Sequence, residues 1–352
     1  MLRIGFLALA QAHQPLHWLP AALELAKRPG VRVDVLCPSR ANLLFIKSYD
    51  PDKRLNCIWI PIGFRDGLFD LPPRKYVHRF YGWLFRRYSV LVTTETTSTR
   101  LKNNPKFKSC LIRIRHGVGD AATRIDDPRV RKFDLQLVGG AKDKRRLIAA
   151  GLATEENCVV AGYAKFELVR PPARLFANDN PIVLYNPHCR RDLSSWHDHG
   201  RELVHLMERM VDWNFVVAPH VKMQGGPHVR SHAGNILIDM GSVHSIDMTY
   251  AQAASIYVGD ASSQVYEFLR VPRPCIFLNT HRMDWRNRED FAHFRLGQVI
   301  DEPDQLREAL DSASSLQRKF ERLQRAAVQD SIDVANRPAS VRQADAILER
   351  CA

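Results

Sequence analysis

The sequence predicts an α/β protein with two domains, each built around a parallel β-sheet. Its 352 residues are too many for one typical hydrophobic core and suit two domains of ordinary size. Residues 3–10 form an apolar run of strand length, residues 16–27 have helical spacing, and residues 31–38 alternate like a strand. This strand–helix–strand order is typical of parallel sheets. A second alternation of the same kind begins at residue 182.

The remaining strands of the first domain are predicted from short apolar runs. They are expected at residues 57–62, 89–94, 109–116, 135–140 and 158–163. The following segment is rich in Pro, Asn and Asp and has little periodicity, which is typical of a linker. We therefore expect a first domain at 1–170, a linker at 171–181, a second domain at 182–335 and a C-terminal helix at 336–352.

The second domain has its own series of predicted strands. They are expected at residues 182–187, 214–220, 235–240, 255–260 and 275–280. Helices are predicted at 201–211 and 264–271, and the chain is mainly helical from 302 to 348. Ligands of such sheets bind outside the carboxyl ends of the strands, so these ends are where we look for functional residues.

The composition favours an anionic partner. The chain has 51 Lys and Arg against 38 Asp and Glu, a net charge of +13 that is spread along the sequence. Such a charge favours nucleotides, phosphorylated polymers or anionic lipid, although it can also serve solubility alone. The seven cysteines are irregularly spaced and include no C-x-x-C, so we expect neither a disulfide framework nor a zinc site, and a cytoplasmic location. Asp50-Pro51-Asp52 is interpreted as a turn, and no metal or cofactor is expected.

Residues 258–269, VGDASSQVYEFL, contain a candidate phosphate site. A predicted strand ends at Asp260, and Ser262 or Ser263 can cap the helix that follows. A helix N-terminus after a parallel strand offers N–H groups to a phosphate, and Glu267 would lie one turn deeper, within reach of a ribose. The alternative is a capped helix that binds nothing.

Two histidines stand at the ends of predicted strands. His116-Gly117 ends the strand at 109–116, and Gly117 allows a ligand to approach the backbone closely. His220 follows Pro219 at the end of the strand at 214–220. One histidine can act as a general base while a second donates to a developing anion. With 14 histidines in the chain, both could equally be surface residues in turns.

Basic residues accompany two other segments. Arg190 and Arg191 follow the strand at 182–187 and could clamp phosphate oxygens, although a solvated loop explains them as well. Residues 74–91 mix five basic side chains with six aromatic ones. On a helix this mixture suits an anionic membrane surface, or a helix that packs its aromatics on the sheet. No nucleic-acid-binding module is recognisable, so nucleic acid is not an expected partner.

Taken in chain order, these segments resemble the CDP-glycerol glycerophosphotransferases of the teichoic-acid primase and polymerase type. The resemblance rests on His116-Gly117, on YNPHCRRD at 185–192, on His220 after proline, and on residues 253–269. It covers residues 109–280. It implies a GT-B fold, in which two Rossmann-like domains face each other across a cleft, with C-terminal helices.

The resemblance implies transfer of glycerol phosphate from CDP-glycerol to a hydroxyl of a lipid- or glycan-linked acceptor, with release of CMP. His116 would be the general base and His220 would steady the pyrophosphate. Gly117, Arg190, Arg191, Asp260, Ser262 and Ser263 would lie near phosphate, and Glu267 near ribose. Such an enzyme would work in the cytoplasm, at the inner face of the membrane.

The sequence departs from the family pattern at several positions. Val-Gly-Asp follows His116-Gly117 where the family usually has Thr-Pro-Leu-Lys, Ala261 replaces a tyrosine, and Glu267 replaces an aspartate. Two alternative enzymes therefore stay open. One is a GT-B glycosyltransferase that uses a nucleotide sugar, and the other is a sugar-nucleotide 2-epimerase. A protein that binds a nucleotide without catalysis is a third.

Overall fold

The computed structural model describes residues 1–63, 66–120, 127–170, 174–223, 229–262 and 264–351. The chain divides into two compact units, which are treated separately below. Unit 1 comprises residues 1–118, 124–168 and 330–352, and unit 2 comprises residues 119–123 and 169–329. The final segment of the chain thus returns to the unit in which the chain begins.

Unit 1 contains a seven-stranded parallel sheet in the order β3-β2-β1-β4-β5-β6-β7. The strands are β1 (Leu2–Leu7), β2 (Val31–Cys37), β3 (Asn56–Trp59), β4 (Val90–Thr93), β5 (Cys110–Ile114), β6 (Leu135–Val138) and β7 (Cys158–Val160). The helices are α1 (Leu19–Leu25), α2 (Arg40–Lys47), α3 (Arg74–Phe85), α4 (Ala141–Ala149) and α9 (Ala339–Cys351). The strand order reverses between β1 and β4, as in a Rossmann fold.

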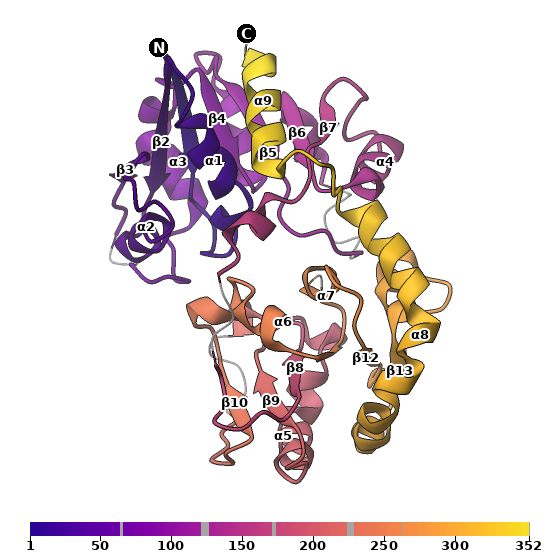
Figure 1. Ribbon diagram of the computed structural model, residues 1–352. Helices are drawn as coiled ribbons and strands as arrows, with labels where there is room; N and C mark the ends of the chain where they lie inside the picture. Colours follow the sequence, from indigo (N-terminus) through magenta and orange to yellow (C-terminus); the bar gives the residue numbers. More distant parts are fainter. Residues whose placement is uncertain (64–65, 121–126, 171–173, 224–228, 263, 352) are drawn as a thin grey trace. The chain divides into compact units, whose positions relative to one another are not determined.

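Helices cover both faces of this sheet because its strands bury both sets of alternating side chains. On one face, Ile4 and Phe6 of β1 belong to a core that also includes residues of α1 and α9. On the other face, Leu91 and Leu111 pack in a core with Val77 and Phe85 of α3. Figure 1 shows α9 beside α1.

Unit 2 contains a six-stranded parallel sheet in the order β10-β9-β8-β11-β12-β13. Its strands are β8 (Ile182–Asn186), β9 (Asn214–Val217), β10 (Ile236–Ile238), β11 (Ile256–Gly259), β12 (Cys275–Leu278) and β13 (Gln298–Ile300). Its helices are α5 (Ser195–Glu208), α6 (Thr249–Ala253), α7 (Gln264–Phe268) and α8 (Leu306–Ser331). The order reverses between β8 and β11, so unit 2 repeats the Rossmann plan of unit 1.

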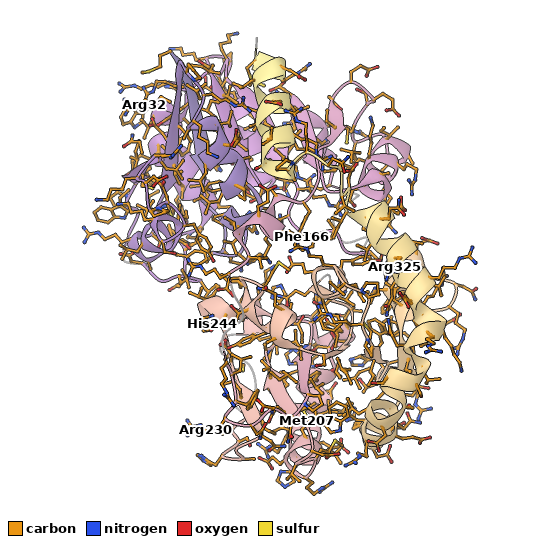
Figure 2. All side chains as sticks on the ribbon, in the orientation of Figure 1. Arg32, Phe166, Met207, Arg230, His244 and Arg325 are labelled. Carbon is orange, nitrogen blue, oxygen red and sulfur yellow. The ribbon has the colours of Figure 1, made fainter. Side chains whose placement is uncertain are left out.

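The long helices of unit 2 also bury apolar side chains in a core and expose polar ones. Met207 of α5 is buried in a core that also contains Leu306 and Leu310 of α8. On the outer side of α8, Arg325 is exposed and pairs with Glu321 one turn earlier (Figure 2). Both helices are therefore apolar towards the sheet and polar towards solvent.

Several predicted boundaries were wrong. Helix α7 ends at Phe268, because Pro272 restricts the backbone that precedes it and the chain turns before that point. Helix α5 begins at Ser195, earlier than predicted, because the Ser194 side chain caps it by accepting a hydrogen bond from the Trp196 N–H at 3.2 Å. Strand β13, which has only three residues, was not predicted. The turn predicted around Asp50-Pro51-Asp52 is confirmed.

Candidate active site

In unit 2, three polar residues lie just beyond the carboxyl ends of adjacent strands. His188 follows β8, His220 follows β9 and Asp260 follows β11. Strand β8 pairs with both of its neighbours, and the strand order reverses between β8 and β11. This is the edge at which parallel α/β sheets bind ligands.

Asp260 connects this edge to the loop after β8. Its buried carboxylate accepts hydrogen bonds from the backbone N–H of His188 at 2.6 Å and from the N–H and hydroxyl of Ser195 at 2.8 and 3.0 Å. Burial raises the pKa of Asp260 to about 6, and the hydrogen bonds only partly offset this effect. The carboxylate thus fixes the start of α5 and the path of the His188 loop, and its proximity to phosphate stays a prediction.

His188 and His220 present the same type of hydrogen-bond donor. Their ring centroids are 6.0 Å apart. Nδ1 of His188 accepts from the N–H of Arg190, and Nδ1 of His220 accepts from the N–H of Lys222, both at 3.2 Å. Since an imidazole nitrogen that accepts carries no proton, the proton of each ring is on Nε2. Burial lowers the pKa of His188 to about 4, with the charges of Arg190 and Lys222 adding to the effect, so this ring is a neutral donor near pH 7.

The hydroxyl of Ser262 is hydrogen-bonded to protein groups, whereas the sequence predicts that it binds phosphate. The buried Ser262 hydroxyl donates to Oδ1 of Asn186 at 2.9 Å and accepts from the N–H of Gln264 at 3.3 Å. It therefore ties the end of β11 to the end of β8 and caps α7, which has only five residues. Glu267 lies buried on α7. Ser263 lies outside the described residues.

The two arginines are exposed and paired with nearby carboxylates. Nε of Arg190 lies 3.0 Å from Oδ1 of Asp192, and Nη2 of Arg191 lies 3.2 Å from Oδ1 of Asp198. Exposed ion pairs of this kind contribute little, about 0–1 kcal/mol, so either arginine can exchange its partner for an anionic ligand at small cost.

In unit 1, His116 and Gly117 follow β5. Nδ1 of His116 lies 3.2 Å from the carbonyl oxygen of Thr94, which follows β4. A carbonyl oxygen can only accept, so Nδ1 carries the proton and Nε2 carries the lone pair. Gly117 has φ +74°, a left-handed conformation that favours glycine and turns the chain immediately after the histidine. His116 is therefore held in the tautomer that a general base requires.

Two further histidines, which the sequence analysis missed, surround His116. They are His13 and His17, from the loop and short 3₁₀ helix after β1, and their ring centroids lie 6.1 and 6.2 Å from that of His116. Burial lowers the pKa of His17 well below its usual value, and the charges of Lys165 and His116 act in the same direction. The signal was present in the sequence, because QAHQPLH directly follows the first predicted strand.

Comparisons with known proteins agree with this architecture. Residues 143–349, more than half of the chain, match the family model of CDP-glycerol:poly(glycerophosphate) glycerophosphotransferase. The structure is similar to that of the wall teichoic acid polymerase TagF, with a TM-score of 0.69 at 13% identity over 99% of this chain and 88% of that chain. It is also similar to UDP-GlcNAc 2-epimerase from Neisseria meningitidis, with a TM-score of 0.63 at 13% identity over 99% and 100% of the two chains. No protein with a curated description matches the sequence.

The two parallel-sheet units define a GT-B fold of two Rossmann-like domains, as predicted, and the class is that of transferases with this fold. More specifically, the chain belongs to the CDP-glycerol:poly(glycerophosphate) glycerophosphotransferase family.

Proposed function

We propose that this enzyme transfers glycerol phosphate from CDP-glycerol to a hydroxyl of a lipid- or glycan-linked cell-envelope acceptor and releases CMP. The observation that carries the proposal is the tautomer of His116, whose Nδ1–H is committed to the Thr94 carbonyl and whose Nε2 can accept a proton. Family membership supports the donor class. In addition, a TagF variant has been soaked with CDPG.

In the proposed reaction, Nε2 of His116 accepts the proton of the acceptor hydroxyl. The hydroxyl oxygen attacks the phosphorus that carries the glycerol, a phosphodiester bond forms, and the phosphoanhydride bond to CMP breaks. CMP leaves with the electron pair of that bond. Stabilisation of the charge on the phosphate oxygens is the larger task in such transfers.

Unit 2 supplies suitable groups for that task. The Nε2–H groups of His188 and His220 are neutral donors at the carboxyl edge of the sheet, and Asp260 fixes the loop that carries His188. Arg190 and Arg191 can add charge by exchanging their carboxylate partners for phosphate.

A screen of nucleotides followed by a transfer assay tests the proposal. The thermal shift of the protein is measured with CMP, CDP, UDP, GDP and CDP-glycerol, and glycerol phosphate transfer to an extract of envelope acceptors is then followed by release of CMP. We expect cytidine nucleotides to stabilise the protein most. Stabilisation by uridine or guanosine nucleotides alone would sink the proposal.

A second candidate function is a sugar-nucleotide epimerase. It is favoured by the similarity, described above, to UDP-GlcNAc 2-epimerase from Neisseria meningitidis. An epimerase would convert its nucleotide sugar without any acceptor, whereas a transferase releases a nucleotide only when an acceptor is present.

We further propose that helix α3 brings the enzyme to the inner face of the cytoplasmic membrane. Among the described residues, no helix is both long enough and apolar enough to cross a bilayer. Tyr76, Phe80 and Trp83 of α3 are 44%, 59% and 50% exposed. A groove of about 850 Å³ runs between α3 and the 3₁₀ helix Thr97–Asn103, lined by Tyr76, Arg79, Trp83 and Arg100. Exposed aromatics beside arginines suit an anionic lipid interface.

Vesicle sedimentation tests this surface. We expect Phe80→Ala with Trp83→Ala to release the protein from vesicles that contain anionic lipid. Leu323→Ala, which removes an exposed apolar side chain from α8, is the matched control. Equal sedimentation of all three proteins would remove α3 from the interface.

A further inference from the structure

A buried hydrogen-bond network in unit 2 begins at Asp120, four residues after His116. Oδ2 of Asp120 accepts from the hydroxyl of Tyr266 at 2.7 Å and from Nδ1 of His293 at 3.2 Å. The three residues are 3%, 2% and 3% exposed. They come from three separate segments, since Asp120 belongs to the short N-terminal part of unit 2, Tyr266 lies on α7, and His293 lies between β12 and β13.

The network leaves one nitrogen of His293 without a partner. Because a carboxylate accepts, Nδ1 of His293 donates to Asp120, and Nε2 points away from that bond. Nε2 is buried and has no hydrogen-bond partner among the described residues. A buried polar atom in this state costs about 1–3 kcal/mol, so such atoms are commonly satisfied by a ligand or a water.

Oδ2 of Asp120 and Nδ1 of His293 lie at ion-pair distance, 3.2 Å apart, and both side chains are buried. A protonated ring carries an N–H on Nε2 as well, which makes this atom a charge-assisted donor. A metal ion would instead need a lone pair there, and no cluster of three metal-ligating side chains occurs among the residues that the structure describes.

His293 belongs to the same strand edge as the candidate site. Its ring packs edge-on against Phe277 of β12, with centroids 5.5 Å apart. Its charge acts on both Asp260 and His188, which lie beyond the ends of β11 and β8. An anion held at this edge would therefore find a donor in His293.

We propose that Nε2–H of His293 binds a phosphate oxygen of the nucleotide donor, and that Asp120 is the positioning residue that orients the ring. This inference rests on the proposed function for the identity of the donor. It also gives a role to the departure of this chain from its family, because Asp120 belongs to the Val-Gly-Asp that replaces the usual continuation of the His-Gly motif. The same segment thus supplies the proposed base, His116, and the orienting carboxylate.

Calorimetric titration of His293→Gln, Asp120→Asn and the double variant tests the pair. The probe is whichever of CDP, UDP and GDP binds the wild-type protein most tightly. We expect His293→Gln to weaken its binding at least tenfold and Asp120→Asn to weaken it about threefold to tenfold. The double variant should bind no worse than His293→Gln alone, because Asp120 acts through the ring. His205→Gln, which changes an exposed histidine of α5, is the matched control and should bind like the wild type.

The outcomes separate this inference from the proposed function. The identity of the nucleotide that binds most tightly tests the proposed function. The loss of nucleotide affinity in His293→Gln tests the role of His293, whichever nucleotide is used. A lower melting temperature with unchanged nucleotide affinity would assign His293 a purely structural role and overturn the proposal. Failure of the wild-type protein to bind any of the three nucleotides would overturn it as well.

A measurement on the wild-type protein covers the case in which the variants do not fold. The exchange of the imidazole C2 proton with deuterium is followed for each histidine by mass spectrometry. Saturating nucleoside diphosphate should slow exchange at His293 severalfold and leave His205 unchanged. An unaltered rate at His293 would show that no phosphate reaches its ring.

Discussion

The two strand edges of this enzyme use histidine in opposite hydrogen-bonding states. In unit 1, His116 donates from Nδ1 to a carbonyl, which leaves Nε2 as an acceptor. In unit 2, His188 and His220 accept backbone N–H groups at Nδ1, which leaves Nε2–H as a donor. A single contact of Nδ1 with the backbone therefore decides whether a strand-end histidine can remove a proton or bind an anion.

The titratable groups around the two edges also differ. His116 lies near His13 and His17, and the charge of the buried Lys165 acts on His17, so the charged side chains of this region are basic. The unit 2 edge includes the buried carboxylate of Asp260, whose pKa is raised to about 6, and His188, whose pKa is lowered to about 4. Two units of the same topology thus have strand edges with different chemistry, because the loops beyond their strands differ.

The largest effect is expected for the proposed base. His116→Gln removes the acceptor nitrogen and should lower kcat by about 10³-fold, within the range for loss of a general base. Binding of the nucleotide, which we assign to unit 2, should stay within twofold of wild type. Transfer assays and calorimetry measure the two quantities. His232→Gln, an exposed histidine outside both edges, serves as the control. If His116→Gln turned over near the wild-type rate, His116 would not be the base, and the proposed difference between the two edges would be wrong.

The unit 2 edge should leave a signature in the pH dependence of stability. The folded pKa of Asp260, about 6, lies above its ordinary value of 3.8, so the folded protein binds the extra proton and this residue destabilises the fold as pH rises from about 4 to 6. The folded pKa of His188, about 4, lies below 6.5, so the unfolded chain binds the extra proton and this residue destabilises the fold as pH falls through that range. In the wild-type protein the two contributions oppose each other.

Single substitutions should uncover each contribution. In His188→Asn the free energy of unfolding should fall as pH rises from 4 to 6, relative to wild type, and in Asp260→Asn it should fall as pH decreases, each by about 2–3 kcal/mol. Urea unfolding at several pH values measures the slopes, which do not depend on the loss of stability that either substitution causes at all pH values. Parallel slopes in the two variants would show that Asp260 and His188 are more accessible to water than the structure indicates.

A smaller effect is expected at His220, the proposed second donor to the developing anion. His220→Ala removes one Nε2–H and should lower kcat/KM about 10- to 100-fold, as for the loss of one donor to a developing anion. A His220→Asn variant, whose amide N–H can still donate, should recover part of that loss. Steady-state kinetics with the nucleotide donor measure both. If alanine and asparagine were equally damaging, the role of His220 would be something other than donation.

The sequence predicts the strand ends well because parallel strands are buried on both faces and read as continuous apolar runs. The apolar runs alone therefore place His116 and His220 at the carboxyl ends of predicted strands, although the observed strands β5 and β9 end earlier, at Ile114 and Val217. The helical spacing from Leu16 predicts α1 but says nothing of His13, in the preceding loop, or of His17, at the end of a short 3₁₀ helix.

Side-chain direction is what the sequence could not supply. Asp260 and Ser262 lie at the carboxyl end of the strand, as predicted, but nothing local indicates that the carboxylate binds the His188 loop or that the hydroxyl binds Asn186. The contact between Asp120 and His293 joins residues 173 positions apart, so it depends on the tertiary structure alone. Tautomers likewise follow from backbone contacts that a sequence pattern does not contain.

The smallest effect is expected at Ser262, where the structure and the sequence point to different roles. Ser262→Ala removes the bond to Asn186 and the cap of α7, which should cost about 1–2 kcal/mol in the free energy of unfolding. Affinity for the nucleotide should fall less than threefold, because the hydroxyl is already committed to protein partners. Ser315→Ala, on the exposed surface of α8, controls for the substitution itself. A tenfold loss of affinity with little change in stability would place the hydroxyl on a phosphate, and Ser262 would then join His188 and His220 as a donor at the unit 2 edge.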